Sequence, residues 1–124
     1  MAFEIIREPR GVIKRLSGFV SVEEYQRSIE LVLDSAFFDD LRYVIVDASK
    51  IDDYDFTGES LGEIALLRHV VFRSNPRCVI AFVVTSTHLA RLIVHAVFPV
   101  KDIITVGIVT SLEEARLWIE RQRQ

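Results

Sequence analysis

The sequence contains a single cysteine, Cys78, so no disulfide bond can form within the chain. A lone cysteine at the start of an apolar run, Cys78 to Val84, is typical of a buried and unreactive thiol. It also suits a reducing compartment, and the first ten residues lack the pattern of a signal peptide. No apolar run reaches about 18 residues, so no transmembrane helix is expected. We therefore expect a cytoplasmic protein.

The sequence also has only a small excess of acidic over basic residues. The chain has 15 basic and 18 acidic residues, a net charge of −3, which is too small to indicate a partner. A nucleic-acid-binding module usually carries a basic stripe, so that class of protein is not expected. Half of the 124 residues are hydrophobic, which suits a globular domain with its own core. We expect one domain over residues 1–124.

The usual signatures of catalysis and nucleotide binding are missing. The five glycines do not form a Rossmann or Walker pattern, and no serine lies in a G-x-S-x-G motif. Cys78 has no histidine nearby in the sequence. We therefore expect a non-enzymatic protein with no catalytic residues, no metal site and no cofactor.

Apolar periodicity predicts strands and helices in the order β-β-α-β-α-β-α-β-α. The expected strands are Phe3–Glu8, Val12–Leu16, Tyr43–Val46, Cys78–Val84 and Ile103–Val109. The expected helices begin near Ser21, Thr57, Ser86 and Ser111. Alternating strands and helices imply a mostly parallel sheet, to which the opening hairpin adds an antiparallel pair. The expected fold is therefore a mixed α/β domain, with Cys78–Val84 as its central strand.

Two helix starts carry the S-x-x-E capping box, Ser21 with Glu24 and Ser111 with Glu114. The second helix has apolar residues at helical spacing, which predicts its buried face. These residues are Leu61, Ile64, Ala65, Leu67, Val71 and Phe72.

Acidic residues cluster after the third expected strand, which ends at Asp47. They are Asp47, Asp52, Asp53, Asp55 and Glu59, on an expected loop and the start of the second helix. Ligands often bind at the carboxyl ends of strands in α/β sheets, and several carboxylates together suit a hard cation. One hypothesis is therefore a metal-dependent hydrolase, although the EF-hand pattern is absent. A solvated acidic loop is the simpler interpretation.

Several segments resemble STAS-like domains, in particular the SpoIIAA-like group. They are the opening hairpin, Val44–Asp47, Val79–Val84 and Ser111–Ile119, and the resemblance spans nearly the whole chain. It implies a bacterial regulatory module that binds a protein partner. CRAL-TRIO lipid-transfer domains are distant relatives in fold, so the resemblance also implies an alternative, a protein that binds a small apolar ligand or lipid.

The resemblance points to one short segment. In the anti-anti-sigma factors of this family, the helix after the third strand begins with Asp-Ser-Ser-Gly, and a kinase phosphorylates the first serine. The matching residues here are Asp55-Phe56-Thr57-Gly58, so Phe56 replaces that serine and Thr57 matches the second one. Thr57 is therefore either a phosphoacceptor at a helix N-terminus or an ordinary N-cap.

The third helix, Thr87–Val97, is apolar around most of its circumference. Its polar residues His88, Arg91 and His95 form one narrow stripe, which suits either an anion site or a solvated edge. The two histidines lie two turns apart, about 10.5 Å, too far for one shared zinc ion. A helix this apolar suggests a subunit interface or a ligand pocket. We expect a homodimer through this helix, or another protein partner.

Overall fold

The computed structural model describes residues 2–122, without the side chains of residues 68–72. Its strands are β1 (Phe3–Glu8), β2 (Gly11–Val20), β3 (Tyr43–Tyr54), β4 (Val79–Val83) and β5 (Val106–Val109). Its helices are α1 (Val22–Leu33), α2 (Gly58–Phe72), α3 (Thr87–Val97) and α4 (Leu112–Gln122). Two short 3-10 helices are η1 (Phe38–Asp40) and η2 (Phe98–Val100).

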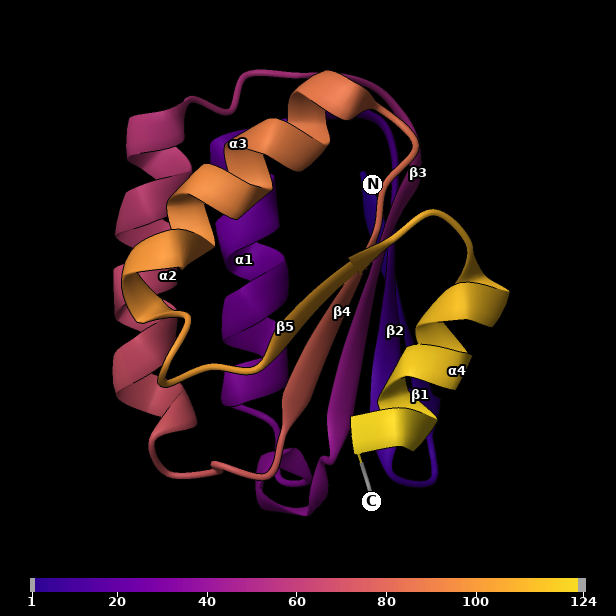
Figure 1. Ribbon diagram of the computed structural model, residues 1–124, viewed down its shortest axis with the longest axis vertical. Coiled ribbons are helices and arrows are strands. Elements are labelled where there is room, and N and C mark those ends of the chain that lie inside the picture. Colours follow the sequence, from indigo (N-terminus) through magenta and orange to yellow (C-terminus); the bar gives the residue numbers. More distant parts are fainter. Residues whose placement is uncertain (1, 123–124) are drawn as a thin grey trace.

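The five strands form one sheet in the order β1-β2-β3-β4-β5. Strands β1 and β2 are antiparallel, whereas β2, β3, β4 and β5 run parallel. Each parallel strand is added on the same side of the previous one, so right-handed crossovers bring α1, α2 and α3 to one face. Helix α4 packs against the other face (Figure 1). The expected mixed α/β fold and order of elements are confirmed.

The sheet separates two hydrophobic clusters. The larger lies between the sheet and helices α1 to α3, and the smaller lies between the sheet and α4. Gly107 of β5 lets α4 approach closely, because a Cβ atom there would collide with the Trp118 ring. Alternate side chains of the central strands enter the two clusters, as Val44 and Ile45 show.

The strands β2 and β3 are longer than the sequence predicts. Strand β2 continues past Leu16 to Val20, β3 continues past Val46 to Tyr54, and the two pair as far as Val20 with Tyr54. Polar residues interrupt the apolar pattern there, but backbone hydrogen bonding does not require apolar side chains. The pairing shifts register at Gly18, whose φ of 67° is the left-handed conformation that glycine tolerates.

The central strand is β3, and the prediction that Cys78–Val84 is central was wrong. Strand β4 lies next to the short edge strand β5. The apolar run predicted its burial on both faces correctly, since Ile80 to Val84 are all buried, but burial does not reveal strand order. Strand β5 also begins at Val106 and not at Ile103, which is 53% exposed.

The buried face of α2 agrees only in part with the prediction. Leu61, Ile64 and Ala65 are buried, whereas Leu67 is 59% exposed. Leu67 lies about 240° around the helix from Leu61, on the side away from the sheet. The expected core residues Val71 and Phe72 are outside the described side chains.

Only the serine half of each predicted capping box forms. The backbone N–H groups of Glu24 and Glu114 donate to the hydroxyls of Ser21 and Ser111, each at 3.1 Å. The carboxylate of Glu24, however, accepts from the N–H of Ala2, and that of Glu114 accepts from Thr110. Glu114 thus fixes the chain that enters α4, whereas Glu24 ties the start of α1 to Ala2, the residue before β1.

Candidate functional site

The first predicted site residue, Asp47, lies within β3 and not at its end. Its Oδ1 accepts hydrogen bonds from the backbone N–H and the hydroxyl of Ser49, at 3.0 and 2.6 Å. Asp52 and Asp53 are exposed residues of the same strand, so the expected acidic loop was wrong. The carboxylates are spread along β3 because this strand continues beside β2.

Asp55 follows β3 directly and binds the start of another helix. Its Oδ1 accepts the backbone N–H of Val22, the first residue of α1, at 2.8 Å. That N–H has no partner within its helix, and the positive end of the helix dipole favours a carboxylate. Asp55 therefore joins the entry of α2 to the N-terminus of α1.

Thr57 caps α2. The N–H of Ser60 donates to the Thr57 hydroxyl at 3.0 Å, and the N–H of Thr57 donates back to the Ser60 hydroxyl at 2.9 Å. The sequence predicts this cap, although the reciprocal role of Ser60 was missed. Gly58 begins the helix beside α3, since a Cβ atom there would lie 3.8 Å from Cδ2 of His95. The segment Asp55–Gly58 and the polar stripe of α3 therefore lie next to each other, at Gly58 and His95.

Phe56 is buried beneath this helix start. Its ring lies 5.2 Å from that of Tyr54 and 5.6 Å from that of Tyr25, measured between ring centroids. Tyr54 also stacks on His88 of α3, at 6.3 Å. The family pattern marks Phe56 only as the replacement of a serine. The alternation of Tyr54 and Phe56 with aspartates was the signal that both aromatic rings point toward the core, Phe56 buried and Tyr54 half-buried.

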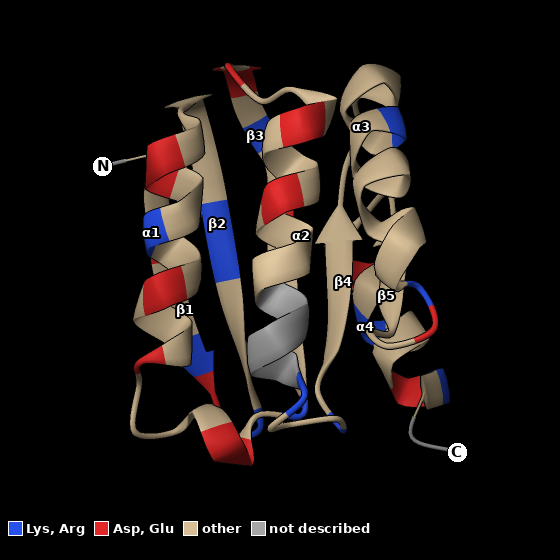
Figure 2. Cartoon of the chain, turned by 90° about the vertical axis from the view of Figure 1, so that its left-hand side faces the viewer, with Lys and Arg blue, Asp and Glu red and all other residues tan. Residues whose placement is uncertain are grey.

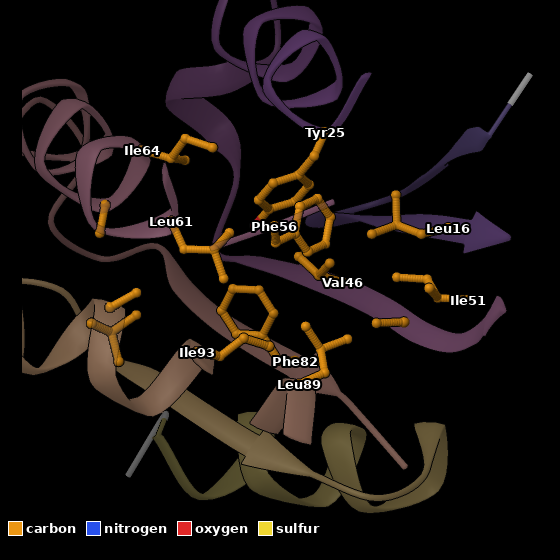
Figure 3. Close-up of a pocket in the computed structure, with 14 residues that line it drawn as sticks. Leu16, Tyr25, Val46, Ile51, Phe56, Leu61, Ile64, Phe82, Leu89 and Ile93 are labelled. Atoms are coloured by element: carbon orange, nitrogen blue, oxygen red, sulfur yellow. The ribbon is translucent and has the colours of Figure 1, made fainter. Parts of the chain in front are cut away.

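An apolar cavity lies next to Phe56 (Figure 3). Side chains of β2, β3, β4 and all three helices of that face surround it, among them Leu61, Phe82 and Ile93. Its volume is about 40 Å³, well below the roughly 150 Å³ that holds one benzene molecule. An acyl chain does not fit, so the lipid-carrier alternative gains no support.

The third helix presents its polar stripe to solvent, which agrees with either hypothesis, an anion site or a solvated edge. His88, Arg91 and His95 are exposed, while Leu89 and Ile93 are buried on the opposite side. Figure 2 shows a single charged band on this helix. A shallow groove of about 360 Å³ follows the exposed face, lined by Thr87, Ala90, Arg91, Val94, His95 and Phe98.

Two large apolar side chains form most of this groove. Val94 is 52% exposed and Phe98 is 63% exposed, and Leu66 and Leu67 on α2 are exposed as well. We call Val94, Phe98, Arg91 and His95 the α3 surface. Exposed apolar groups with a polar rim are typical of protein-binding sites.

The carboxylates do not form a metal site. Glu59 is exposed at the start of α2, and Asp55 is engaged with α1. Among the described residues, no three His, Cys, Asp or Glu side chains lie close enough together to hold a metal ion. The hydrolase hypothesis therefore has no ligand set in this part of the chain.

Similar folds occur in solved structures. The anti-sigma factor antagonist SpoIIAA in its unphosphorylated form has a TM-score of 0.62 and 18% identity, over 97% of this chain and 98% of that one. The phosphorylated form of the Bacillus cell fate determinant SpoIIAA has a TM-score of 0.56 and 16% identity, over 95% and 99%. An uncharacterized DUF3478 protein from Shewanella loihica PV-4 has 0.56 and 14%, over 95% and 92%.

No protein-family model and no curated protein matches the chain. The structural matches show that this chain has the SpoIIAA-like fold, which the resemblance in the sequence predicts. No helix within residues 2–122 is long and apolar enough to cross a membrane.

Proposed function

We propose that this chain is a non-enzymatic regulatory module of the STAS type, which binds a protein partner through the α3 surface and the start of α2. The observation that carries the proposal is the exposure of Val94 and Phe98, which share a groove with His95, the residue next to Gly58 at the start of α2. The similarity in fold to an anti-sigma factor antagonist supports it. A cytoplasmic location in a bacterium belongs to the same proposal.

The polar residues of this region suit a contact with a protein. Arg91 and His95 edge the groove, so an apolar side chain of a partner can enter while its carboxylates meet the rim. Glu59 and Thr57 add exposed polar groups at the start of α2. Burying one exposed phenylalanine is worth about 1.5–3 kcal/mol, which makes Phe98 the expected anchor.

The form of this proposal that can be tested first is a homodimer through the α3 surface. Native mass spectrometry of the wild type at micromolar concentration should show a dimer. The substitution Phe98→Glu should give a monomer, because it places a charge in the interface. The matched control is Leu117→Glu, which changes an exposed leucine on α4, on the other face of the sheet. It should remain a dimer.

A wild type that is monomeric at every concentration would contradict self-association, and the partner of the α3 surface would then be a different protein. Equal loss of the dimer in Leu117→Glu would show a general effect of charge.

A phosphoacceptor role for Thr57 stays a hypothesis beside its role as a helix cap. The side chain is exposed, and a phosphate there would meet the free N–H groups of the first turn of α2. Intact-mass analysis of protein from its natural host tests it, since each phosphate adds about 80 Da. Absence of that mass under all growth conditions would leave Thr57 as a helix cap.

A further inference from the structure

Three arginines lie at the end of the sheet where the parallel strands begin, opposite to the end that carries Thr57. Arg10 and Arg42 directly precede β2 and β3, and Arg77 lies two residues before β4. The backbone holds these segments side by side. The N–H of Arg42 donates to the carbonyl of Arg10 at 2.7 Å, and the N–H of Val79 donates to the carbonyl of Arg42 at 3.0 Å.

The three arginines line one groove of about 670 Å³. This volume lies within the range of roughly 300–1,000 Å³ that is usual for small-molecule sites. Thr105 and Gln122 contribute polar groups, and the other lining residues are Pro76, Val79 and Ile119. Figure 2 shows basic residues along this end of the sheet, next to the acidic residues of η1, while the opposite ends of α1 and α2 are acidic. The groove therefore combines positive charge with an apolar wall.

Within the described part of the chain, no carboxylate forms an ion pair with any of these three arginines. Nη1 of Arg42 donates to two backbone carbonyls, those of Asp39 and Leu41, at 3.3 and 3.0 Å. The ion pairs found among the described residues, Lys101–Asp102 and Glu8–Arg116, involve none of the three arginines.

The nearest acidic residues in the sequence are Asp39 and Asp40, which precede Arg42. Both are exposed, and within the described part of the chain neither forms an ion pair with an arginine of the groove. Like charges that line one groove repel each other, so a bound anion would relieve this repulsion.

We propose that this groove, formed by Arg10, Arg42 and Arg77, is a binding site for a ligand with clustered phosphate groups. The guanidinium group offers planar pairs of donors that match the oxygen atoms of phosphate, and it keeps its charge at any physiological pH. The three groups come from three different loops and line the same groove. The site shares no lining residue with the groove on the α3 surface, lies at the opposite end of the strands from Thr57, and does not depend on the proposed protein-binding surface.

Isothermal titration calorimetry with sodium triphosphate at low salt tests the site. The wild type should bind, and its affinity should fall as salt is added, because the arginines are accessible to solvent. The double variant Arg10→Gln/Arg77→Gln should bind at least about tenfold more weakly. Both side chains are exposed, so the fold should persist, which circular dichroism checks.

The matched control is Arg15→Gln/Arg27→Gln, which removes the same charge from exposed positions on β2 and α1. It should bind triphosphate within about twofold of the wild type. Equal weakening in both double variants would overturn the site, since the effect would then come from net charge alone.

A second arm distinguishes a soluble ligand from a lipid headgroup. Sedimentation with phosphatidylcholine vesicles is compared with and without phosphatidylinositol 4-phosphate. Binding of triphosphate without sedimentation identifies a soluble ligand. Sedimentation that requires the phosphorylated lipid, and that Arg10→Gln/Arg77→Gln abolishes, identifies a headgroup. Binding of neither probe by the wild type overturns the proposal.

Discussion

Phe56 occupies the position that carries the regulatory phosphate in the family that the sequence resembles. A serine at a phosphorylation site must reach solvent, whereas the Phe56 side chain is only 9% exposed and packs on Tyr25 and Tyr54. The Phe56 ring lies in the core directly before the start of α2. At this position the chain has a core residue where a switch would need an accessible hydroxyl.

Replacing Phe56 with serine should therefore destabilise the protein and not restore a switch. We expect Phe56→Ser to lower the free energy of unfolding by about 3–5 kcal/mol, because it enlarges the neighbouring cavity and buries a hydroxyl. The control Phe56→Leu keeps most of the volume and should cost less than half as much. Urea denaturation followed by circular dichroism gives both values. A Phe56→Ser variant as stable as the wild type would contradict the core role.

The role of a residue could be predicted from the sequence where its hydrogen-bond partner lies within a few positions along the chain. The Thr57 cap depends on Ser60, three positions away, and such a cap can be read from the sequence. Asp55 was named as a site residue, but its partner Val22 lies 33 positions earlier. The contact between Gly58 and His95 was hidden for the same reason, since it depends on how α2 and α3 pack.

Asp55 matters at the scale of elements because it joins the end of β3 to the beginning of α1. We expect Asp55→Ala to lower the free energy of unfolding by about 1 kcal/mol, as the loss of a helix cap does. Asp55→Asn keeps the oxygen acceptor and should cost only about 0.3–1 kcal/mol through the helix dipole.

The matched control for Asp55→Ala is Asp52→Ala, on an exposed position of β3. It should change the free energy of unfolding by no more than about 0.5 kcal/mol. Thermal and urea unfolding of Asp55→Ala, Asp55→Asn and Asp52→Ala measure whether the losses of unfolding free energy follow this order. Equal effects of Asp52→Ala and Asp55→Ala would show that the bond to Val22 contributes nothing.

The bounds of helices and strands were predicted well where apolar residues recur at one period. They were predicted poorly where the length of a strand depends on its pairing with a neighbouring strand. Strand β1 has the predicted bounds, Phe3–Glu8. Strand β3 was cut short at Val46, since its second half carries aspartates on exposed positions beside β2. The arginine groove was also missed, although an arginine just before each of three strands is visible in the sequence.

At the scale of the whole molecule, the first strand is tied to the last helix. Nη1 and Nη2 of Arg116 donate to the carboxylate of Glu8, at 3.1 and 2.8 Å, and the Tyr43 hydroxyl donates to the same carboxylate. The hydrogen bond from Arg116 lowers the pKa of Glu8. Burial, and then the bond to Glu8, raises the pKa of Tyr43.

This link should depend on pH. The pKa of Glu8 is lower in the folded chain than the value of about 4.3 in an unfolded chain. Its stabilising effect is therefore present above that value and is lost as the pH falls through the folded pKa.

Arg116→Gln should lower the free energy of unfolding by about 0.5–1 kcal/mol at pH 7, a modest effect because the arginine is partly exposed. The difference from the wild type should shrink toward zero below the folded pKa of Glu8. Urea unfolding at a series of pH values measures it, with Arg121→Gln on the same helix as the control. A difference that stays constant down to pH 2 would contradict the role of Glu8.

The order of strands in the sheet also affects how the protein is made. Because the spatial order β1-β2-β3-β4-β5 repeats the order along the chain, each strand leaving the ribosome finds its neighbour already synthesised. No strand has to be inserted between two that have already paired. The sheet can thus grow from one edge as translation proceeds, and α4 covers its second face only after β5 and residues 112–122 have emerged.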